Sequence, residues 1–199
     1  LDTLNTDFSL LYFNSQKSGI GMNTSTSIGE PLVLYTETAL RWGKTGKKLK
    51  LTKEGIPNIS PDIYTLEQVD NSYLNLVFGG QYTFNDGTNV ICEYIYNGAG
   101  YNQDEWNFFY DVIDYSYKEY KKDFVKESMQ TNLLQANDIM DFNKMRKHYI
   151  FARINNSYVR DDFDKTLVCM LNTDDSSFLI NPSIDYKINP NMVIGLSST

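Results

Sequence analysis

The chain has 199 residues, 41% of them hydrophobic and 14% aromatic, and a formal net charge of −7. An acidic chain disfavours a nucleic-acid partner, because phosphate binding needs a basic surface. The sequence has no run of about eighteen apolar residues, which excludes a transmembrane helix, and two cysteines are too few for a disulfide scaffold or a zinc site. We interpret Cys92 and Cys169 as small apolar strand residues, and the start at Leu1 predicts a processed or partial chain.

Alternation of apolar and polar residues with a period of two predicts nine β-strands. They are Thr3–Phe13, Gly19–Ile28, Leu32–Trp42, Leu74–Phe84, Thr88–Tyr96, Lys147–Asn155, Lys165–Asn172, Ser177–Ile188 and Asn191–Ser198. Segments of about nine to eleven residues with this period have the length that a tilted strand needs to cross a bilayer. The pattern favours an all-β fold, an antiparallel up-and-down transmembrane β-barrel or a fragment of a larger one, spanning residues 1–199 as one domain.

Aromatic residues of the apolar parity gather at both ends of these strands. The loop-end group is Trp42, Tyr94 and Tyr96, and the turn-end group is Tyr82, Phe84 and Tyr186. Two such belts, separated by aliphatic residues, are typical of the two interfaces of a membrane barrel. We therefore expect the apolar residues between them, among them Leu34, Leu40, Leu76 and Ile180, to contact lipid.

The opposite parity of the strands carries isolated charged and polar residues. They are Asp7, Glu37, Arg41, Gln81, Glu93, Arg153, Asp185 and Lys187. Charges are costly in lipid, so in a membrane barrel these side chains face inward and line the pore. Acids and bases nearly balance, which predicts weak charge selectivity or internal salt bridges that close the lumen. The alternative is that they form the solvent face of a soluble sheet.

Two long connections, Gly43–Ser72 and Asn97–Arg146, follow the third and fifth strands and lie on one side of an up-and-down sheet. Most connections on the other side are short, and this asymmetry is typical of outer-membrane barrels with long extracellular loops. The first connection holds the basic cluster Lys44, Lys47, Lys48, Lys50 and Lys53. We interpret the cluster as a solvated loop or, alternatively, as a contact with lipid head-group phosphates.

The second connection, residues 97–146, contains its own predicted helix. Apolar and aromatic residues recur there at spacings of three and four from Asp104 to Phe124, and a second short helix is predicted within Gln130–Asn143. The residues expected to constrict or cap the barrel mouth are Trp106, Phe109, Tyr110, Ile113 and Tyr117. Alternatively, this aromatic face packs on the barrel rim or on a neighbouring chain.

No enzyme constellation is visible, so we predict no catalytic residue, cofactor or metal, although a carboxylate pair of the glycosidase kind stays open. The single histidine, His148, has no nucleophile motif beside it and is interpreted as an interfacial residue. Acidic turns at Asp161-Asp162 with Asp164, and at Asp174-Asp175, offer oxygen ligands for Ca²⁺ without the EF-hand spacing. We interpret both as solvated turns.

Two hairpins carry a resemblance to a known group. The run Gly79–Gly98, with the turn Asn85-Asp86-Gly87, and the segment Asn172–Gly195, with Asp174-Asp175-Ser176 between its strands, resemble hairpins of bacterial outer-membrane porin-like β-barrels. The resemblance implies a Gram-negative outer-membrane location and passive passage of solutes. Such barrels have an even number of strands and end in Phe or Tyr, whereas nine strands and a final Leu196-Ser197-Ser198-Thr199 predict a piece of a larger barrel.

The sequence therefore predicts an outer-membrane channel for passive passage of small solutes or ions. Its expected partners are membrane lipid and small solutes, together with a possible protein partner or further copies of the chain. The alternatives are a soluble or surface β-rich binding protein, and a barrel sheath around another protein such as an electron carrier.

Overall fold

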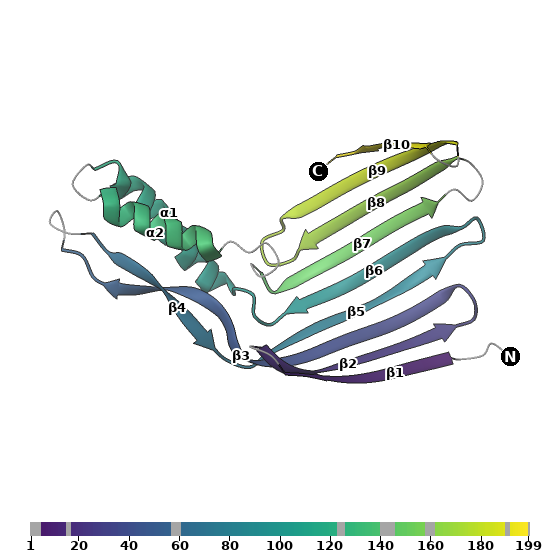
Figure 1. Cartoon of the computed structure of the whole chain (residues 1–199), viewed down its shortest axis with the longest axis horizontal. Coiled ribbons are helices and arrows are strands. Elements are labelled where there is room, and N and C mark those ends of the chain that lie inside the picture. The colour runs from purple at the N-terminus through teal and green to yellow at the C-terminus, as the bar shows by residue number, and fades with distance from the viewer. Residues whose placement is uncertain are drawn as a thin grey trace.

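Nine strands follow one another as an antiparallel meander in this chain (Figure 1). The structure is a computed structural model that describes residues 5–14, 17–56, 61–122, 126–139, 146–157, 162–189 and 192–198. The strands are β1 (Asn5–Phe13), β2 (Lys17–Ile28), β3 (Leu32–Lys53), β4 (Ile63–Asp70), β5 (Tyr73–Thr83), β6 (Thr88–Asn97), β7 (His148–Ser157), β8 (Phe163–Asn172), β9 (Phe178–Asn189) and β10 (Met192–Ser197). All nine predicted strands are present.

The order of the sheet is β1-β2-β3-β5-β6-β7-β8-β9-β10, and each strand pairs with its neighbours in antiparallel register. The prediction of an all-β, antiparallel up-and-down sheet is therefore confirmed. Within the described residues, β1 and β10 form the two edges and do not pair with each other, so the sheet is open.

The prediction of an irregular connection over Gly43–Ser72 was wrong for most of its length. β3 runs on to Lys53 and pairs with β4, which forms a hairpin that extends beyond the rest of the sheet (Figure 1). The alternation of Lys48, Leu49, Lys50 and Leu51 is a strand period with a basic outer face. The basic cluster therefore lies on a strand and not in a solvated loop.

Two helices cover this hairpin, α1 (Gln103–Tyr120) and α2 (Lys126–Ile139). A capping box begins α1, in which the Glu105 amide donates to Asn102 Oδ1 at 2.8 Å and the Asn102 amide donates to Glu105 Oε2 at 3.0 Å. The two predicted helices are therefore confirmed, although α2 begins four residues earlier than expected. The predicted ends at Phe124 and at 140–143 lie outside the described residues. Neither helix is long and apolar enough to cross a membrane.

The buried hydrophobic residues of the described chain gather in this one region. They are Leu49, Tyr64, Tyr101, Phe109, Val112, Met129 and Ala136. The amide of Asn132, fully buried, ties α2 to β4: its Oδ1 accepts from the Tyr64 amide and its Nδ2 donates to the Asp62 carbonyl, each at 3.1 Å. We call the hairpin of residues 47–67 together with α1 and α2 the cap. The nine-strand sheet contributes no large hydrophobic side chain to this core except Leu49 of the β3 extension.

Candidate functional site

One face of the sheet is apolar and uncovered. Register places Phe78 beside Tyr94, Tyr94 beside Ile150, Ile150 beside Leu171 and Leu171 beside Phe178, so one row crosses five strands on the same face. Phe78 is 57% exposed and Phe178 is 74% exposed. The predicted lipid contacts Leu34, Leu40 and Ile180 are exposed on this face, and Leu76 is half-buried on it. No second layer of the described chain lies over the face.

The same face carries almost no charge. Exposed large side chains on it include Phe8, Leu10, Tyr12, Ile20, Met22, Leu74, Tyr82, Ile154, Ile184, Tyr186, Ile194 and Leu196. Lys165 is the one charged residue on this face in the described strands, when β3 is counted only to Trp42. Its ammonium lies 5.3 Å from the centre of the Phe163 ring, near the turn end. Cys92 and Cys169 also lie on this face as free thiols, each paired in register with Ala152. We call this surface the apolar face.

Aromatic rings lie at both ends of the apolar face. At the end near the cap, His148 lies 5.1 Å from the Tyr96 ring centre, and its Nδ1 is 2.7 Å from the Tyr94 hydroxyl. At the turn end, Tyr82 and Phe84 have ring centres 4.7 Å apart, and Phe163 and Tyr186 have theirs 4.8 Å apart. The arrangement agrees with the predicted two belts and with the interpretation of His148 as a belt residue.

The opposite face, here called the polar face, mixes charged and amide side chains with apolar ones such as Phe151 and Val168, and it holds all eight residues that the sequence predicted to line a pore. Register places Asp7, Glu37, Arg41, Gln81, Glu93, Arg153, Asp185 and Lys187 there. The Tyr35 hydroxyl donates to the Glu93 carboxylate across Gly79, whose position between them leaves room for the ring. A Cβ at Gly79 would come within 2.7 Å of Glu93 Cγ.

Two further contacts order the charges of this polar face. The Asn23 amide donates to the Glu37 carboxylate at 3.2 Å, and the Arg41 guanidinium lies 5.3 Å from the centre of the Phe13 ring.

The five residues predicted to constrict or cap the mouth lie in three different surroundings. Phe109 is buried in the cap and Ile113 packs against its core, whereas Tyr117 is exposed with Lys121 4.6 Å from its ring centre. Only Trp106 and Tyr110, at the start of α1, reach over the polar face of the sheet. The apolar stripe of α1 is wide, so residues at its two edges contact different parts of the molecule.

A groove of about 570 Å³ lies beneath these two rings, on the polar face where β6, β7, β8 and β9 end near the cap. No pattern in the sequence singles out one of its lining residues, Arg146, which is only 2% exposed. Arg146 Nη2 donates to Gln103 Oε1 at 2.7 Å, its guanidinium lies 5.2 Å from the Trp106 ring centre, and its Nε lies 3.4 Å from Asp175 Oδ2. Arg146 thus joins the cap to the turn between β8 and β9.

The turn at Asp174-Asp175 is partly solvated, since Asp175 is exposed, but it is also a structural joint, which was not predicted from the sequence. Asp174 Oδ2 accepts from the backbone amides of Lys147 and His148 at 3.0 and 3.3 Å. Burial would raise the pKa of Asp175, but hydrogen bonds from Ser177 and the charge of Arg146 lower it overall, so the carboxylate stays ionised. The described residues contain no cluster of three or more metal-ligand side chains, and Asp161 lies outside them.

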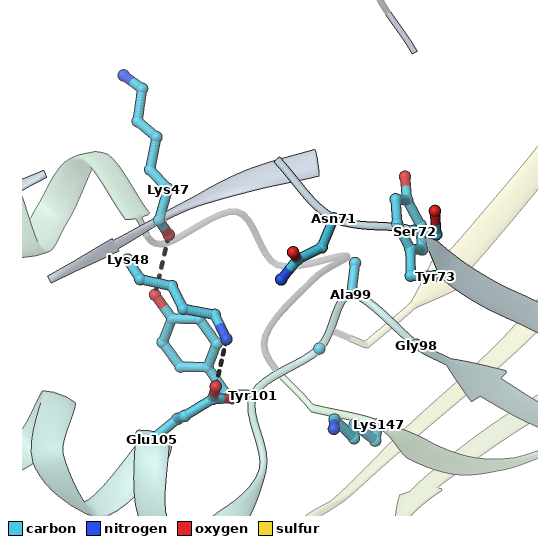
Figure 2. A pocket seen from close by; sticks show the side chains of 11 residues that line it. Lys47, Lys48, Asn71, Ser72, Tyr73, Gly98, Ala99, Tyr101, Glu105 and Lys147 are labelled. Atoms are coloured by element: carbon cyan, nitrogen blue, oxygen red, sulfur yellow. Dashed lines mark hydrogen bonds and ion pairs between the residues drawn. The ribbon is translucent and has the colours of Figure 1, made fainter. Parts of the chain in front are cut away.

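A smaller hollow of about 220 Å³ marks the joint between the cap and the sheet (Figure 2). The Lys48 ammonium pairs with the Glu105 carboxylate there, and the Tyr101 hydroxyl donates to the Lys47 carbonyl at 3.2 Å. Burial, and next the Glu105 charge, raise the pKa of Tyr101 to about 12. In Figure 2 the Lys47 side chain points away from the hollow. We therefore interpret the hollow as a structural contact and not as an anion-binding site.

Compared with models of protein families, with curated proteins and with solved structures, the chain matches none of them. The function is therefore inferred from the two faces of the sheet and the groove.

Proposed function

We propose that this chain forms the wall of an outer-membrane β-barrel channel, with the apolar face against lipid and the polar face toward a water-filled lumen. The single observation that carries the proposal is the apolar face, which crosses nine strands with one charge and no covering layer in the described chain. Each buried Leu, Ile or Phe side chain gains about 1.5–3 kcal/mol on leaving water. Such a face needs a cover, and hydrocarbon suits its exposed aliphatic side chains, its single charge and its aromatic borders.

Strand length supports lipid as the cover. β5, β6, β7, β8 and β9 have 11, 10, 10, 10 and 12 residues, and a tilted strand needs about 9–11 residues to cross the hydrocarbon core. The aromatic belts lie at the two ends of that span.

Total surface gives independent support. A soluble folded protein of 23.0 kDa exposes about 9,600 Å², whereas this chain exposes 13334 Å². The excess is expected of a one-layer wall whose two faces meet lipid and water, and not of a protein folded around its own core. The soluble binding protein, the alternative reading of the sequence, needs a core that the described sheet lacks.

In a membrane the open edges β1 and β10 need hydrogen-bonding partners, because an unsatisfied backbone group in hydrocarbon costs several kcal/mol. The barrel is then closed by further strands, from this protein or from another copy. The nearly balanced charges on the polar face give the channel weak charge selectivity, which suits passive passage of small solutes or ions.

The test is the current through a planar lipid bilayer after the full chain, purified in detergent, is added to one side. Discrete current steps are expected, and Glu93→Gln and Arg153→Gln should shift ion selectivity in opposite directions because both side chains face the lumen. Lys165→Gln, on the apolar face, is the matched control and should leave selectivity unchanged. A chain that stays folded and soluble without detergent and produces no steps would refute the channel.

A further inference from the structure

The groove beneath α1 is lined by aromatic and aliphatic side chains, among them Ile95, Met170 and Leu179, and by a smaller set of polar groups that we call its floor. Trp106 and Tyr110 come from the cap, and Tyr149 comes from β7 of the sheet. The Trp106 and Tyr110 rings stand at 89° with centres 5.0 Å apart, so they form a corner. Its volume of about 570 Å³ is within the range of small-molecule sites, about 300–1,000 Å³.

The floor of the groove has hydrogen-bonding capacity that the described residues do not use. Arg146 is only 2% exposed, yet its Nε and Nη1 have no hydrogen-bond acceptor in the part of the chain that the structure describes. An unsatisfied buried donor is destabilising, so a ligand that supplies an acceptor is favoured there. Asp175, Asn97 and Asn172 add polar groups to the lining.

The two charged residues that line the groove, Arg146 and Asp175, carry opposite charges. The Arg146 guanidinium lies 3.4 Å from the Asp175 carboxylate and 3.9 Å from that of Asp174. An anionic ligand would meet these two carboxylates, and a cationic ligand would meet the guanidinium. A neutral ligand with many hydroxyl groups and flat C–H faces meets neither penalty.

We propose that this groove binds a neutral oligosaccharide, with one sugar ring against the Trp106–Tyr110 corner and its hydroxyl groups on Arg146 and Asp175. Sugar C–H faces pack on aromatic rings, while each hydroxyl both donates and accepts, which suits a guanidinium next to a carboxylate. The groove lies on the face that the proposed function assigns to the lumen, so this inference rests on the proposed function. It names the class of solute that binds at the mouth of the channel.

The test is isothermal titration calorimetry of the full chain in detergent micelles with maltotriose, cellotriose and triacetylchitotriose. At least one neutral trisaccharide should bind, and Tyr110→Ala should weaken that binding by about tenfold. Tyr117→Ala removes a ring of similar exposure from the same helix, outside the groove, and should leave affinity unchanged. Circular dichroism and protection of α1 from trypsin verify that both variants are folded.

Trigalacturonate, an acidic trisaccharide of similar size, should bind more weakly than the best neutral one. The proposal is overturned if the folded wild type binds none of the three neutral sugars, if Tyr110→Ala binds as well as Tyr117→Ala, or if trigalacturonate is preferred. Calorimetry in micelles needs no current. Binding without current steps would therefore contradict the channel alone, and current without binding would contradict the sugar site alone.

Discussion

Neighbouring residues on one strand experience opposite surroundings in this sheet. Phe78 and Val77 are consecutive in β5, and register places Phe78 on the apolar face and Val77 beside Glu37 on the polar face. In the proposed channel, a charge at the first position would enter hydrocarbon, whereas a charge at the second would enter the lumen next to a carboxylate.

We predict that Phe78→Arg lowers the free energy of unfolding in lipid vesicles by about 2–4 kcal/mol, the cost of Arg near the bilayer midplane. Val77→Arg is the matched control and should cost far less. Urea titration of vesicle-folded protein, followed by circular dichroism, measures both. Equal losses for the two variants would mean that the two faces do not differ in the way described here.

The faces of the sheet are predictable from the sequence because their signal is local. In β9 the apolar set Phe178, Ile180 and Ile184 alternates with Asn181 and Asp185, and the structure places the two sets on opposite faces. Arg146 had no such signal, because its partners Gln103 and Asp175 lie 43 and 29 residues away, in other elements. Contacts between residues of separate connections depend on how those connections fold, and the period of apolar residues in the sequence does not predict that.

The cap is a small folded unit with its own hydrophobic core, and one partly buried ion pair, Lys48 with Glu105, joins its hairpin to α1. Burial would raise the pKa of Glu105, but hydrogen bonds from Lys48 and from the Asn102 amide lower it overall. A carboxyl group with a lowered pKa in the folded state adds stability above its unfolded value of 4.5, and that stability is lost as the pH falls through the folded value.

We therefore predict that the cap loosens as the pH falls below about 4.5, and that Lys48→Gln weakens it at neutral pH and flattens this dependence. Hydrogen exchange of the α1 amides measures the effect. Lys50→Gln is the control, since the pair of Lys50 with Glu67 is more exposed and contributes little. An identical pH dependence in wild type and Lys48→Gln would show that this pair does not hold the cap.

At the level of elements, the sequence revealed both helices but not the hairpin on which they rest. The spacing of Trp106, Phe109 and Ile113 is helical, and Asn102 and Glu105 form the capping box at the start of α1. The β3 extension alternates as well, but its outer residues are lysines, and a dense basic cluster is also the composition of a solvated loop. Only the packing of Leu49 and Tyr64 under the helices decides between the two.

The whole molecule consists of a one-layer sheet with a small cap at one end (Figure 1). The order of its strands follows from short turns such as Asn85-Asp86-Gly87, where Gly87 has a φ of 84°, so the meander was predictable. Closure into a barrel could not be predicted from the sequence, because it depends on what pairs with the outer edges of β1 and β10. The proposed function places lipid on one face of the sheet and water on the other.

The most direct test is electron paramagnetic resonance of nitroxide labels placed one at a time from Leu74 to Gln81 in β5, in the Cys92→Ala, Cys169→Ala background, after insertion into lipid vesicles. Collision with oxygen, which concentrates in hydrocarbon, should peak at the even positions, and collision with a water-soluble nickel complex should peak at the odd ones. Two alternating profiles in opposite phase are the predicted result. Even positions that collide with neither reagent, or that collide with nickel as often as the odd ones, would contradict the membrane wall.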